Sequence, residues 1–383
     1  MNDAMDPEIA LYVHWPFCLK KCPYCDFNSH VSAAVDHRRW RAALLGELAC
    51  FAGETKGRRL TSIFFGGGTP SLMEAETVAQ MIAAAQSHWP GEDDVEITLE
   101  ANPTTVEAGL FKDFCQAGVN RLSLGIQSFD DRALQFLGRT HGAAEAVRAF
   151  ALAVDIFPRS SFDLIYARPG QTVPSWLNEL ECAVDMAVGH LSLYQLTVER
   201  GTEFSKLGVR EAAEPMAASF YEMTQARLAS AGLHAYEISN HARPGDECRH
   251  NLAIWLGGDY VGVGPGAHGR LRNHGQTDAC RQISRPDRWL DAVERTGHGT
   301  ANRTTLDGTE RVEELLMTGL RLTTGIGNYI FQSATGYTFE KAIERGRLEP
   351  LIDGGFLVLD DNGLRATAAG LLRLNAVIAA LLA

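Results

Sequence analysis

The feature that most constrains this fold is an alternation of short apolar runs with amphipathic segments along the first two-thirds of the chain. The apolar runs are rich in β-branched and aromatic residues, and the segments between them repeat apolar residues at the 3.6-residue spacing of a helix. Six strands alternating with six helices predict an α/β fold of βα units around a parallel sheet. The predicted strands are residues 9–14, 60–65, 95–99, 121–126, 162–166 and 191–198, and the predicted helices are residues 38–51, 75–88, 106–117, 143–154, 175–188 and 215–231.

The predicted strands are nearly all apolar, which is typical of a sheet that is covered on both faces. Such a sheet is either an open doubly wound sheet or a partial barrel. In both architectures the functional site lies at the carboxyl ends of the strands. Charged and polar residues follow almost every predicted strand, so we expect the site at that edge.

The pattern changes near residue 239. Residues 240–274 are rich in Gly, His and Arg and show no clear period, and a long irregular segment of this kind is usually functional. Residues 305–383 predict several helices and one hairpin, with strands at 356–359 and 364–366. We therefore predict a core domain at residues 1–243, a connecting segment at residues 244–304 and a small α+β domain, similar to a winged helix, at residues 305–383.

Composition limits the partners of the protein. The chain has 35 Lys and Arg against 47 Asp and Glu, a formal charge of −12, which argues against holding nucleic acid by bulk electrostatics. No apolar run approaches the ~20 residues of a membrane span. Residues 1–9 lack the apolar core of a signal peptide. We expect a cytoplasmic protein that binds no nucleic acid.

Three of the eight cysteines crowd into eight residues directly after the first predicted strand. Their spacing is Cys-x₃-Cys-x₂-Cys, and they are Cys18, Cys22 and Cys25. A structural zinc site needs four ligands, and Phe27 stands where a fourth Cys would fall. Three thiolates can instead hold a four-iron cluster and leave one iron open to a substrate. The alternatives are a zinc knuckle completed by His14 or His30, and three free thiols.

A glycine-rich turn follows the second predicted strand, in the sequence Phe65-Gly66-Gly67-Gly68-Thr69-Pro70-Ser71. Consecutive glycines at a strand end let a ligand approach the backbone closely. The turn is neither a dinucleotide-binding GxGxxG motif nor a P-loop. A tight turn without a ligand is the structural alternative.

A cysteine triad after the first strand and a glycine patch after the second together resemble the radical S-adenosylmethionine (SAM) superfamily. This resemblance implies a partial (β/α)₆ barrel in which the three cysteines hold a [4Fe-4S] cluster. It also implies that the open iron takes the amino and carboxylate groups of SAM. The glycine patch, with Gly67, Gly68 and Thr69, would line the methionine end of SAM.

Further motifs are similar to one subfamily, the oxygen-independent coproporphyrinogen oxidases and their relatives, the HemW-type heme chaperones. The motifs are Glu100-Ala101-Asn102-Pro103, Gly125-Ile126-Gln127-Ser128-Phe129, Leu137-Gly138-Arg139 and Asp163-Leu164-Ile165-Tyr166. The resemblance implies SAM contacts for Glu100, Gln127, Arg139 and Asp163, with Tyr12 and Tyr24 as aromatic residues near SAM. Acidic and amide groups suit the ribose hydroxyls and the ammonium of SAM, and an arginine suits its carboxylate.

Three features favour the chaperones over the oxidases within this subfamily. The oxidases carry a fourth Cys at the place of Phe27. They also have a long extension before the first strand, whereas only a few residues precede residue 9 here. The chaperones carry a His-Asn-x-x-Tyr-Trp motif, which here reads His250-Asn251-Leu252-Ala253-Ile254-Trp255, with Ile254 in the Tyr place.

His250 is the first candidate for an axial heme ligand, because a neutral imidazole binds heme iron well. Cys248 and His268 are further candidates, and Trp255 could pack on the macrocycle. The structural alternative is that these residues bond loop backbone or fill the core.

These observations and the resemblance lead to one leading hypothesis. We expect a heme chaperone without coproporphyrinogen oxidase activity, which carries a [4Fe-4S] cluster and an exchangeable SAM and passes heme to acceptor proteins. The alternative is the oxidase, which decarboxylates propionate side chains by radical chemistry. An RNA-modifying radical SAM enzyme is a third reading, which the acidic charge disfavours. Peripheral membrane association would suit heme delivery, but no basic amphipathic helix supports it.

Overall fold

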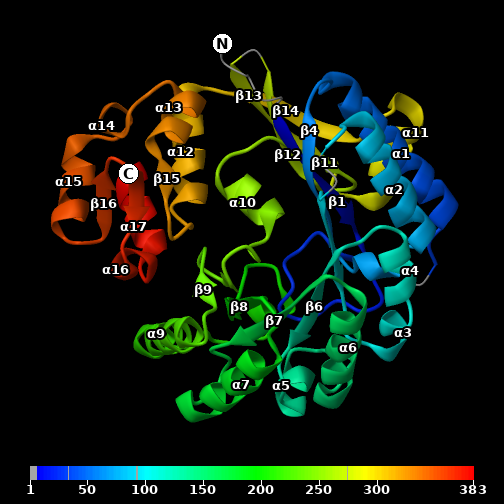
Figure 1. Ribbon diagram of the computed structural model, residues 1–383, viewed down its shortest axis with the longest axis horizontal. Helices are drawn as coiled ribbons and strands as arrows, with labels where there is room; N and C mark the ends of the chain where they lie inside the picture. Colours follow the sequence, from blue (N-terminus) through cyan, green and yellow to red (C-terminus); the bar gives the residue numbers. More distant parts are fainter. Residues whose placement is uncertain (1–6, 33, 92–93, 274) are drawn as a thin grey trace.

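The computed structural model describes residues 7–32, 34–91, 94–273 and 275–383. Six neighbouring parallel strands in chain order form its centre, and helices cover them on the outside (Figure 1). This arrangement confirms the predicted partial (β/α)₆ barrel. The six strands are β1 (Glu8–Trp15), β4 (Arg59–Gly67), β5 (Glu96–Ala101), β6 (Arg121–Gln127), β7 (Arg159–Tyr166) and β8 (His190–Gln195).

The two faces of the barrel strands differ in chemistry, because successive side chains of a strand point to opposite sides. On β1, Leu11, Val13 and Trp15 are buried in the main hydrophobic core. The residues between them, Tyr12 and His14, face the barrel interior and bond to each other. The nearly apolar character expected of the strands therefore applies to their outward positions, and polar groups occupy much of the interior.

The six predicted helices are present on the outside with one break, and two short helices that the sequence did not predict, at residues 131–136 and 203–206, are added. The predicted helix at residues 106–117 is two short helices: the Thr104 side chain caps the first, and Gly109 ends it, because glycine is a poor helix former. The outer helices are α1 (His37–Glu54), α2 (Ala75–His88), α3 (Thr105–Ala108), α4 (Phe111–Gln116), α5 (Asp131–Phe136), α6 (Ala143–Ile156), α7 (Val173–Met186), α8 (Glu203–Lys206) and α9 (Glu214–Ser230), with a 3₁₀ turn, η1 (Pro70–Leu72).

The barrel sheet continues beyond both of its edge strands to twelve strands. Residues 244–304, expected as a connecting segment, contribute α10, α11 and four of these strands, and the predicted domain boundaries remain proposals. The added elements are β9 (His234–Ala235), β10 (Asn240–Ala242), α10 (Arg249–Trp255), β11 (Tyr260–Val263), β12 (His268–Asn273), β13 (Gln276–Gln282), α11 (Pro286–Thr296) and β14 (Thr300–Leu306).

Helix α10 lies at the amino-terminal ends of the barrel strands. Its His250 reaches into the barrel and its ring bonds Ser62 of β4. We call this end of the barrel, formed by α10 and the first residues of the strands, the floor. We call the opposite end, formed by the last residues of the strands and the loops that follow them, the mouth.

The C-terminal region has a hydrophobic core of its own, centred on residues such as Leu315, Phe331 and Leu364. It stands beside the barrel, next to α10 (Figure 1). The predicted hairpin is confirmed as β16 and β17. The elements are α12 (Gly308–Gly319), β15 (Ile326–Gly327), α13 (Asn328–Thr335), α14 (Phe339–Ala342), α15 (Arg345–Asp353), β16 (Leu357–Asp360), β17 (Gly363–Ala366), α16 (Ala368–Leu371) and α17 (Leu374–Leu382).

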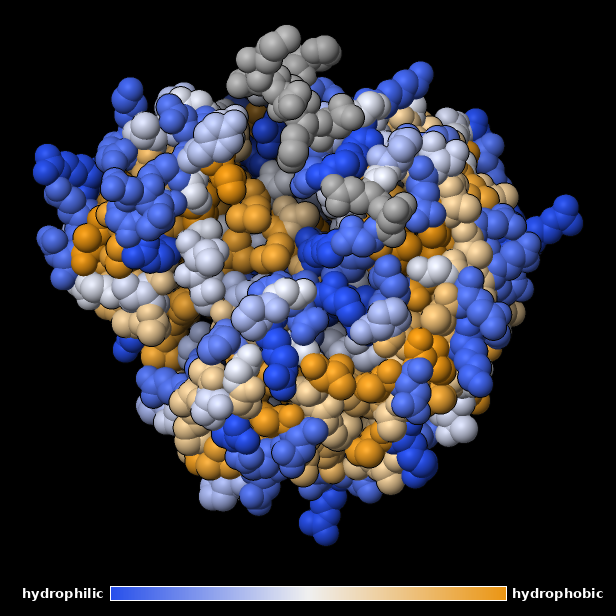
Figure 2. Space-filling model, viewed as in Figure 1, coloured by the Kyte–Doolittle hydropathy of each residue, from blue (hydrophilic) through white to orange (hydrophobic). Residues whose placement is uncertain are grey.

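The surface view mixes hydrophilic and hydrophobic side chains (Figure 2). Among the described residues, no helix combines the length and the apolar character that a membrane crossing requires.

Candidate functional site

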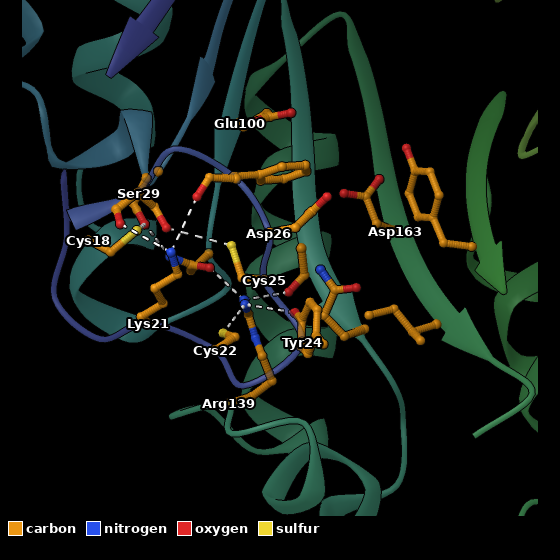
Figure 3. A pocket seen from close by; sticks show the side chains of 18 of the residues that line it. Cys18, Lys21, Cys22, Tyr24, Cys25, Asp26, Ser29, Glu100, Arg139 and Asp163 are labelled. Carbon is orange, nitrogen blue, oxygen red and sulfur yellow. Dashed lines mark hydrogen bonds between the residues drawn. The ribbon is translucent and has the colours of Figure 1, made fainter. Parts of the chain in front are cut away.

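A cavity of about 320 Å³ opens at the mouth of the barrel, where the sequence predicts the site. It is lined by residues of the five barrel strands β4 to β8 and of the loop that carries the three cysteines (Figure 3). The predicted site residues that line it are Cys18, Cys22, Tyr24, Cys25, Gly67, Gly68, Thr69, Glu100, Gln127, Arg139 and Asp163.

The three cysteines lie on one loop, which two short parallel strands close, β2 (Phe17–Cys18) and β3 (His30–Val31). Each thiol is close to one polar side chain. Cys18 Sγ lies 3.3 Å from Thr69 Oγ1, Cys22 Sγ lies 3.4 Å from Arg139 Nη1, and Cys25 Sγ lies 3.6 Å from Ser29 Oγ. Burial raises the pKa of the Cys18 thiol.

The two histidines that would complete a zinc knuckle are engaged elsewhere. His14 Nδ1 lies 3.0 Å from the Tyr12 hydroxyl, and His14 Nε2 lies 3.0 Å from the Asn28 carbonyl oxygen. His30 Nε2 lies 3.1 Å from Asn28 Oδ1. Within the described part of the chain, no three His, Cys, Asp or Glu side chains are arranged around a single ion. The three thiols line one cavity, as ligands of a [4Fe-4S] cluster would, since each thiolate binds a separate iron, and the cluster itself stays a prediction.

The glycine turn packs directly against the start of the cysteine loop. The Gly68 N–H donates to the Trp15 carbonyl at 2.7 Å, and the Thr69 N–H donates to the Phe17 carbonyl at 2.9 Å. A Cβ on Gly68 would lie 2.8 Å from the Phe17 oxygen, a contact that no side chain tolerates. Glycine is therefore required here to bring Thr69 to the Cys18 thiol.

Arg139 joins the cysteine loop to the barrel strands. Its Nη1 approaches Cys22 and the Tyr24 hydroxyl, at 3.4 and 3.5 Å, and its Nη2 donates to the Gly125 carbonyl at 2.9 Å (Figure 3). Its buried Nε has no partner among the described residues. The adjoining Gly138 has φ 71°, and a Cβ there would lie 2.5 Å from Pro23 of the loop.

Two carboxyl groups, Glu100 and Asp163, line the cavity on the side away from the thiols (Figure 3). Burial, and then the neighbouring Asp163, raise the pKa of Glu100 to about 8. Burial raises the pKa of Asp163 to about 6, although the hydroxyls of Ser192 and Ser123 bond it. Arg121 lowers both pKa values and Arg139 lowers that of Asp163, but they offset the effect of burial only in part.

Gln127 enters the cavity from a strained turn. Its φ is 71°, in the left-handed region that non-glycine residues rarely adopt, and the pairing of β6 with β7 shifts register just before it. Such strain persists only where the surroundings hold it, and it is common at binding sites.

Two of the predicted site residues do not line this cavity. Tyr12 lies deeper in the barrel, where its ring stacks on Phe64 at a centroid distance of 6.3 Å. His250 is at the floor and is 2% exposed. Its Nδ1 lies 3.0 Å from Ser62 Oγ, and burial lowers its pKa to about 4. The SAM contact of Tyr12 and the heme contact of His250 therefore remain predictions.

The cavity also has lining residues for which the sequence predicted no role. They are Lys20, Lys21, Asp26, Phe27, Ser29, Pro70, Ala101, Asn102, Ser123, Gly125, Ile165, Tyr194, Gln195, Leu196, Thr197 and Glu199. Strand periodicity could have identified Ser123, which lies four residues before Gln127 and so shares its face. Tyr194 lies inside the predicted strand at residues 191–198 but belongs to no motif, so no local signal marks it.

Family models match both parts of the chain. The model described as the radical SAM superfamily matches residues 12–182. The model described as the HemN C-terminal domain matches residues 306–373.

Relatives match almost the whole chain. The protein named "Heme chaperone HemW" from Escherichia coli (strain K12) is 36% identical, over 98% of this chain and 99% of that protein. The "Radical S-adenosyl methionine domain-containing protein 1, mitochondrial" of Danio rerio is 38% identical, over 98% of this chain and 87% of that protein. The solved structure of coproporphyrinogen III oxidase (HemN) from Escherichia coli superposes with a TM-score of 0.83 at 21% identity, over 98% of this chain and 90% of that one. This last likeness shows the fold alone.

Proposed function

Because the chain belongs to the HemW family of the radical SAM superfamily, we propose that it is a heme chaperone that binds heme and passes it to acceptor proteins. The premise is near full-length similarity to a protein named for that function. The observation that carries the proposal is the mouth cavity, in which three thiols and two carboxyl groups with raised pKa values face one space. A chaperone of this kind would carry a cluster and SAM there as resident groups.

The proposed cluster ligands are Cys18, Cys22 and Cys25. Three thiolates leave one iron of a [4Fe-4S] cluster without a protein ligand, and that iron supplies the binding site for the amino and carboxylate groups of SAM. The unpartnered Nε of Arg139 is placed to pair with a carboxylate. Exposed Phe27, 61% accessible, borders the cavity where a fourth thiol would stand in the oxidases.

The proposed SAM residues follow from the charge of the ligand. SAM has a sulfonium and an ammonium, and a bound cation would favour the charged forms of Glu100 and Asp163, whose pKa values are raised in the free protein. Gln127 offers an amide to the ribose hydroxyls or the adenine. The cavity volume of about 320 Å³ lies at the lower end of the roughly 300–1,000 Å³ of small-molecule sites, which supports one ligand of nucleoside size rather than a nucleoside together with a tetrapyrrole.

His250 is the proposed heme ligand. Its low pKa keeps the imidazole neutral at pH 7, which is the form that binds iron, and its Nε2 has no partner among the described residues. The ring is buried, so iron binding at Nε2 requires α10 to move from the floor. Cys248 is a weaker candidate, because burial raises its pKa to about 12 and keeps it a thiol.

A heme titration of the purified protein and of His250→Ala tests this assignment. We expect the wild-type absorption spectrum to show a nitrogen-ligated heme, and the variant to lose that signature. Identical spectra for the two proteins would remove His250 as a ligand. Transfer of bound heme to an apo-protein acceptor, followed by absorbance, tests the chaperone function itself.

Anaerobic incubation with coproporphyrinogen III, SAM and a reductant tests the alternative oxidase function. We expect no protoporphyrinogen from the reconstituted protein. Its formation at catalytic rates would replace the chaperone proposal with the oxidase. A location in the cytoplasm also stays a prediction, because relatives named as mitochondrial exist, and cell fractionation tests it.

A further inference from the structure

Two turns at the mouth carry the non-glycine residues that have a positive φ in the described part of the chain. Gln127, at the end of β6, has φ 71°, and Ala167, just after β7, has φ 57°. Both turns adjoin the mouth cavity, since Gln127 lines it and so does Ile165, which lies in β7 two residues before Ala167. A backbone held in this region needs surrounding contacts that fix it.

One carboxylate outside the cavity reaches both turns. Glu179 belongs to α7 and is 8% exposed. Its Oε1 accepts the Phe129 N–H at 2.9 Å and the Ser128 hydroxyl, both from the turn after β6. Its Oε2 accepts Arg168 Nη2 at 2.6 Å, from the turn after β7.

Arg168 extends this contact to the wall of the cavity. Its Nη1 donates to the Ile165 carbonyl at 3.0 Å, and its own N–H donates to Gln171 Oε1 at 3.2 Å. The Arg168 and Glu179 side chains are 8% and 7% exposed, so water screens their attraction little. The bonded groups form a continuous link from the residue after Gln127 to Ile165.

We propose that Glu179 is a positioning residue for SAM, which acts by holding the turns that present Gln127 and Ile165 to the cavity. This inference rests on the proposed SAM site and deepens it. Glu179 touches neither SAM nor the cluster, because it lies behind the two turns and does not line the cavity. Without it, the turns would relax toward ordinary backbone angles and the Gln127 amide would leave its place.

The test compares variants of this link with a control pair on the same helix. Arg168→Met with Glu179→Met removes the link without leaving a buried unpaired charge, which is the tolerated way to replace a buried pair. Ser128→Ala removes one of the donors and keeps the ion pair. The control is Glu181→Gln with Arg227→Gln, since that pair is partly exposed, 50% and 27%, and bonds α7 to α9 instead.

The measurement is the dissociation constant of SAM for the cluster-reconstituted protein, made anaerobically, together with the melting temperature. We expect the double variant to bind SAM about tenfold or more weakly, Ser128→Ala about threefold more weakly, and the control like the wild type. The EPR spectrum of the reduced cluster without SAM should match the wild type in all of them. The change that SAM causes in that spectrum should shrink in the double variant, which loss of stability alone would not produce.

A double variant that folds and binds SAM like the wild type would overturn the inference. If the double variant does not fold, the test rests on Ser128→Ala. An unchanged dissociation constant of SAM for Ser128→Ala would then overturn the inference equally. Absence of SAM binding by the wild-type protein would instead remove the proposed SAM site, so the two failures are distinguishable.

Discussion

Glu96 and Glu100 lie on the same strand, β5, and point into the same barrel. Their surroundings at the two ends of the barrel shift their pKa values in opposite directions. At the floor, Glu96 bonds Arg159 at 2.5 Å and accepts the His250 N–H at 3.1 Å. Burial alone would raise its pKa, but Arg121 and Arg159 hold it below the usual value. At the mouth, burial and Asp163 raise the pKa of Glu100 to about 8.

The difference indicates that the charge of Glu96 stabilises the fold, whereas the charge of Glu100 serves to bind a ligand. The chain itself neutralises the floor carboxylate, so Glu96 can stay ionised and hold α10 in place. The carboxyl pair at the mouth keeps raised pKa values although Arg121 and Arg139 act on it, and raised carboxyl pKa values are a common sign of a site prepared for a ligand of opposite charge. Substitutions at each end test whether this division holds.

The cysteines give the largest contrast between the two ends. Replacing Cys18, Cys22 and Cys25 together by Ala should abolish the iron–sulfur absorbance near ~400 nm, because the mouth thiols are the proposed ligands. Cys248→Ala, at the floor, should keep it in full. Metal analysis of both reconstituted proteins checks the result. Full iron content in the triple variant would refute the cluster assignment.

Among single substitutions at the two ends, Glu96→Ala should cost the most stability. It leaves Arg121 and Arg159 at the floor without their carboxylate, and breaking a buried ion pair costs about 3–5 kcal/mol. Urea unfolding measures the loss. Glu100→Gln is the matched change at the mouth and should leave the free energy of unfolding unchanged or slightly higher, since it removes a repulsion. Equal losses in the free energy of unfolding for Glu96→Ala and Glu100→Gln would contradict the proposed difference between the floor and the mouth.

For SAM affinity we expect the larger effect from the substitution at the mouth and the smaller effect from the substitution at the floor. Glu100→Gln removes a carboxyl group that can ionise beside the bound cation, and we expect binding about tenfold weaker, about 1.4 kcal/mol. Glu96→Gln should change the SAM dissociation constant less than twofold in protein that remains folded. Calorimetry on the reconstituted proteins supplies both values. A larger loss of SAM affinity in Glu96→Gln than in Glu100→Gln would contradict the assignment of Glu100 as the carboxyl group that binds SAM.

The smallest effect is a pH dependence of SAM binding. In the free protein Glu100 has a pKa of about 8 and Asp163 of about 6, so both lose protons as the pH rises from 6 to 7.5. A bound cation favours the charged carboxylates, and SAM should therefore bind a few-fold more tightly at pH 7.5 than at pH 6. Glu100→Gln should flatten this slope. A SAM affinity of the wild-type protein that falls between pH 6 and pH 7.5 would contradict the raised pKa values of Glu100 and Asp163.

The same two shifts make a prediction about the protein without SAM. A carboxyl group whose folded pKa is raised stabilises the fold most below its unfolded value, and that contribution is lost as the pH rises through the folded pKa. For Glu100 the window runs from about 4.5 to about 8. Unfolding of the SAM-free protein should therefore become easier across this window, and Glu100→Gln should reduce the slope.

The sequence predicts the framework of the mouth well, because its signals are local. The six strands follow from apolar runs, and the positions of the cysteine loop and the glycine turn follow from their place after β1 and β4. The motif residues Glu100, Gln127, Arg139 and Asp163 all line one cavity. Glu100, Gln127 and Asp163 come from neighbouring parallel strands, as expected, and Arg139 comes from the loop after α5.

What the sequence could not predict depends on contacts between distant residues. Nothing local distinguishes Glu96 from Glu100, because their neighbours Arg121, Arg159 and Asp163 come from other strands. The burial of His250 depends on how α10 docks on the floor, a contact between residues 188 positions apart. The strained turn at Gln127 likewise depends on Glu179, which bonds that turn from 50 residues further along the chain.

The hydrogen bonds of Asn28 bear on when the cluster can be inserted during synthesis of the chain. This residue of the cysteine loop donates through Nδ2 to the carbonyl oxygens of Pro265 and Ser284, at 2.8 and 2.9 Å. The loop is therefore anchored by chain that is translated more than 230 residues later. A nascent barrel that ends near residue 243 has every proposed cluster ligand but not this anchor, so stable cluster insertion is expected only after the ribosome has released residue 284.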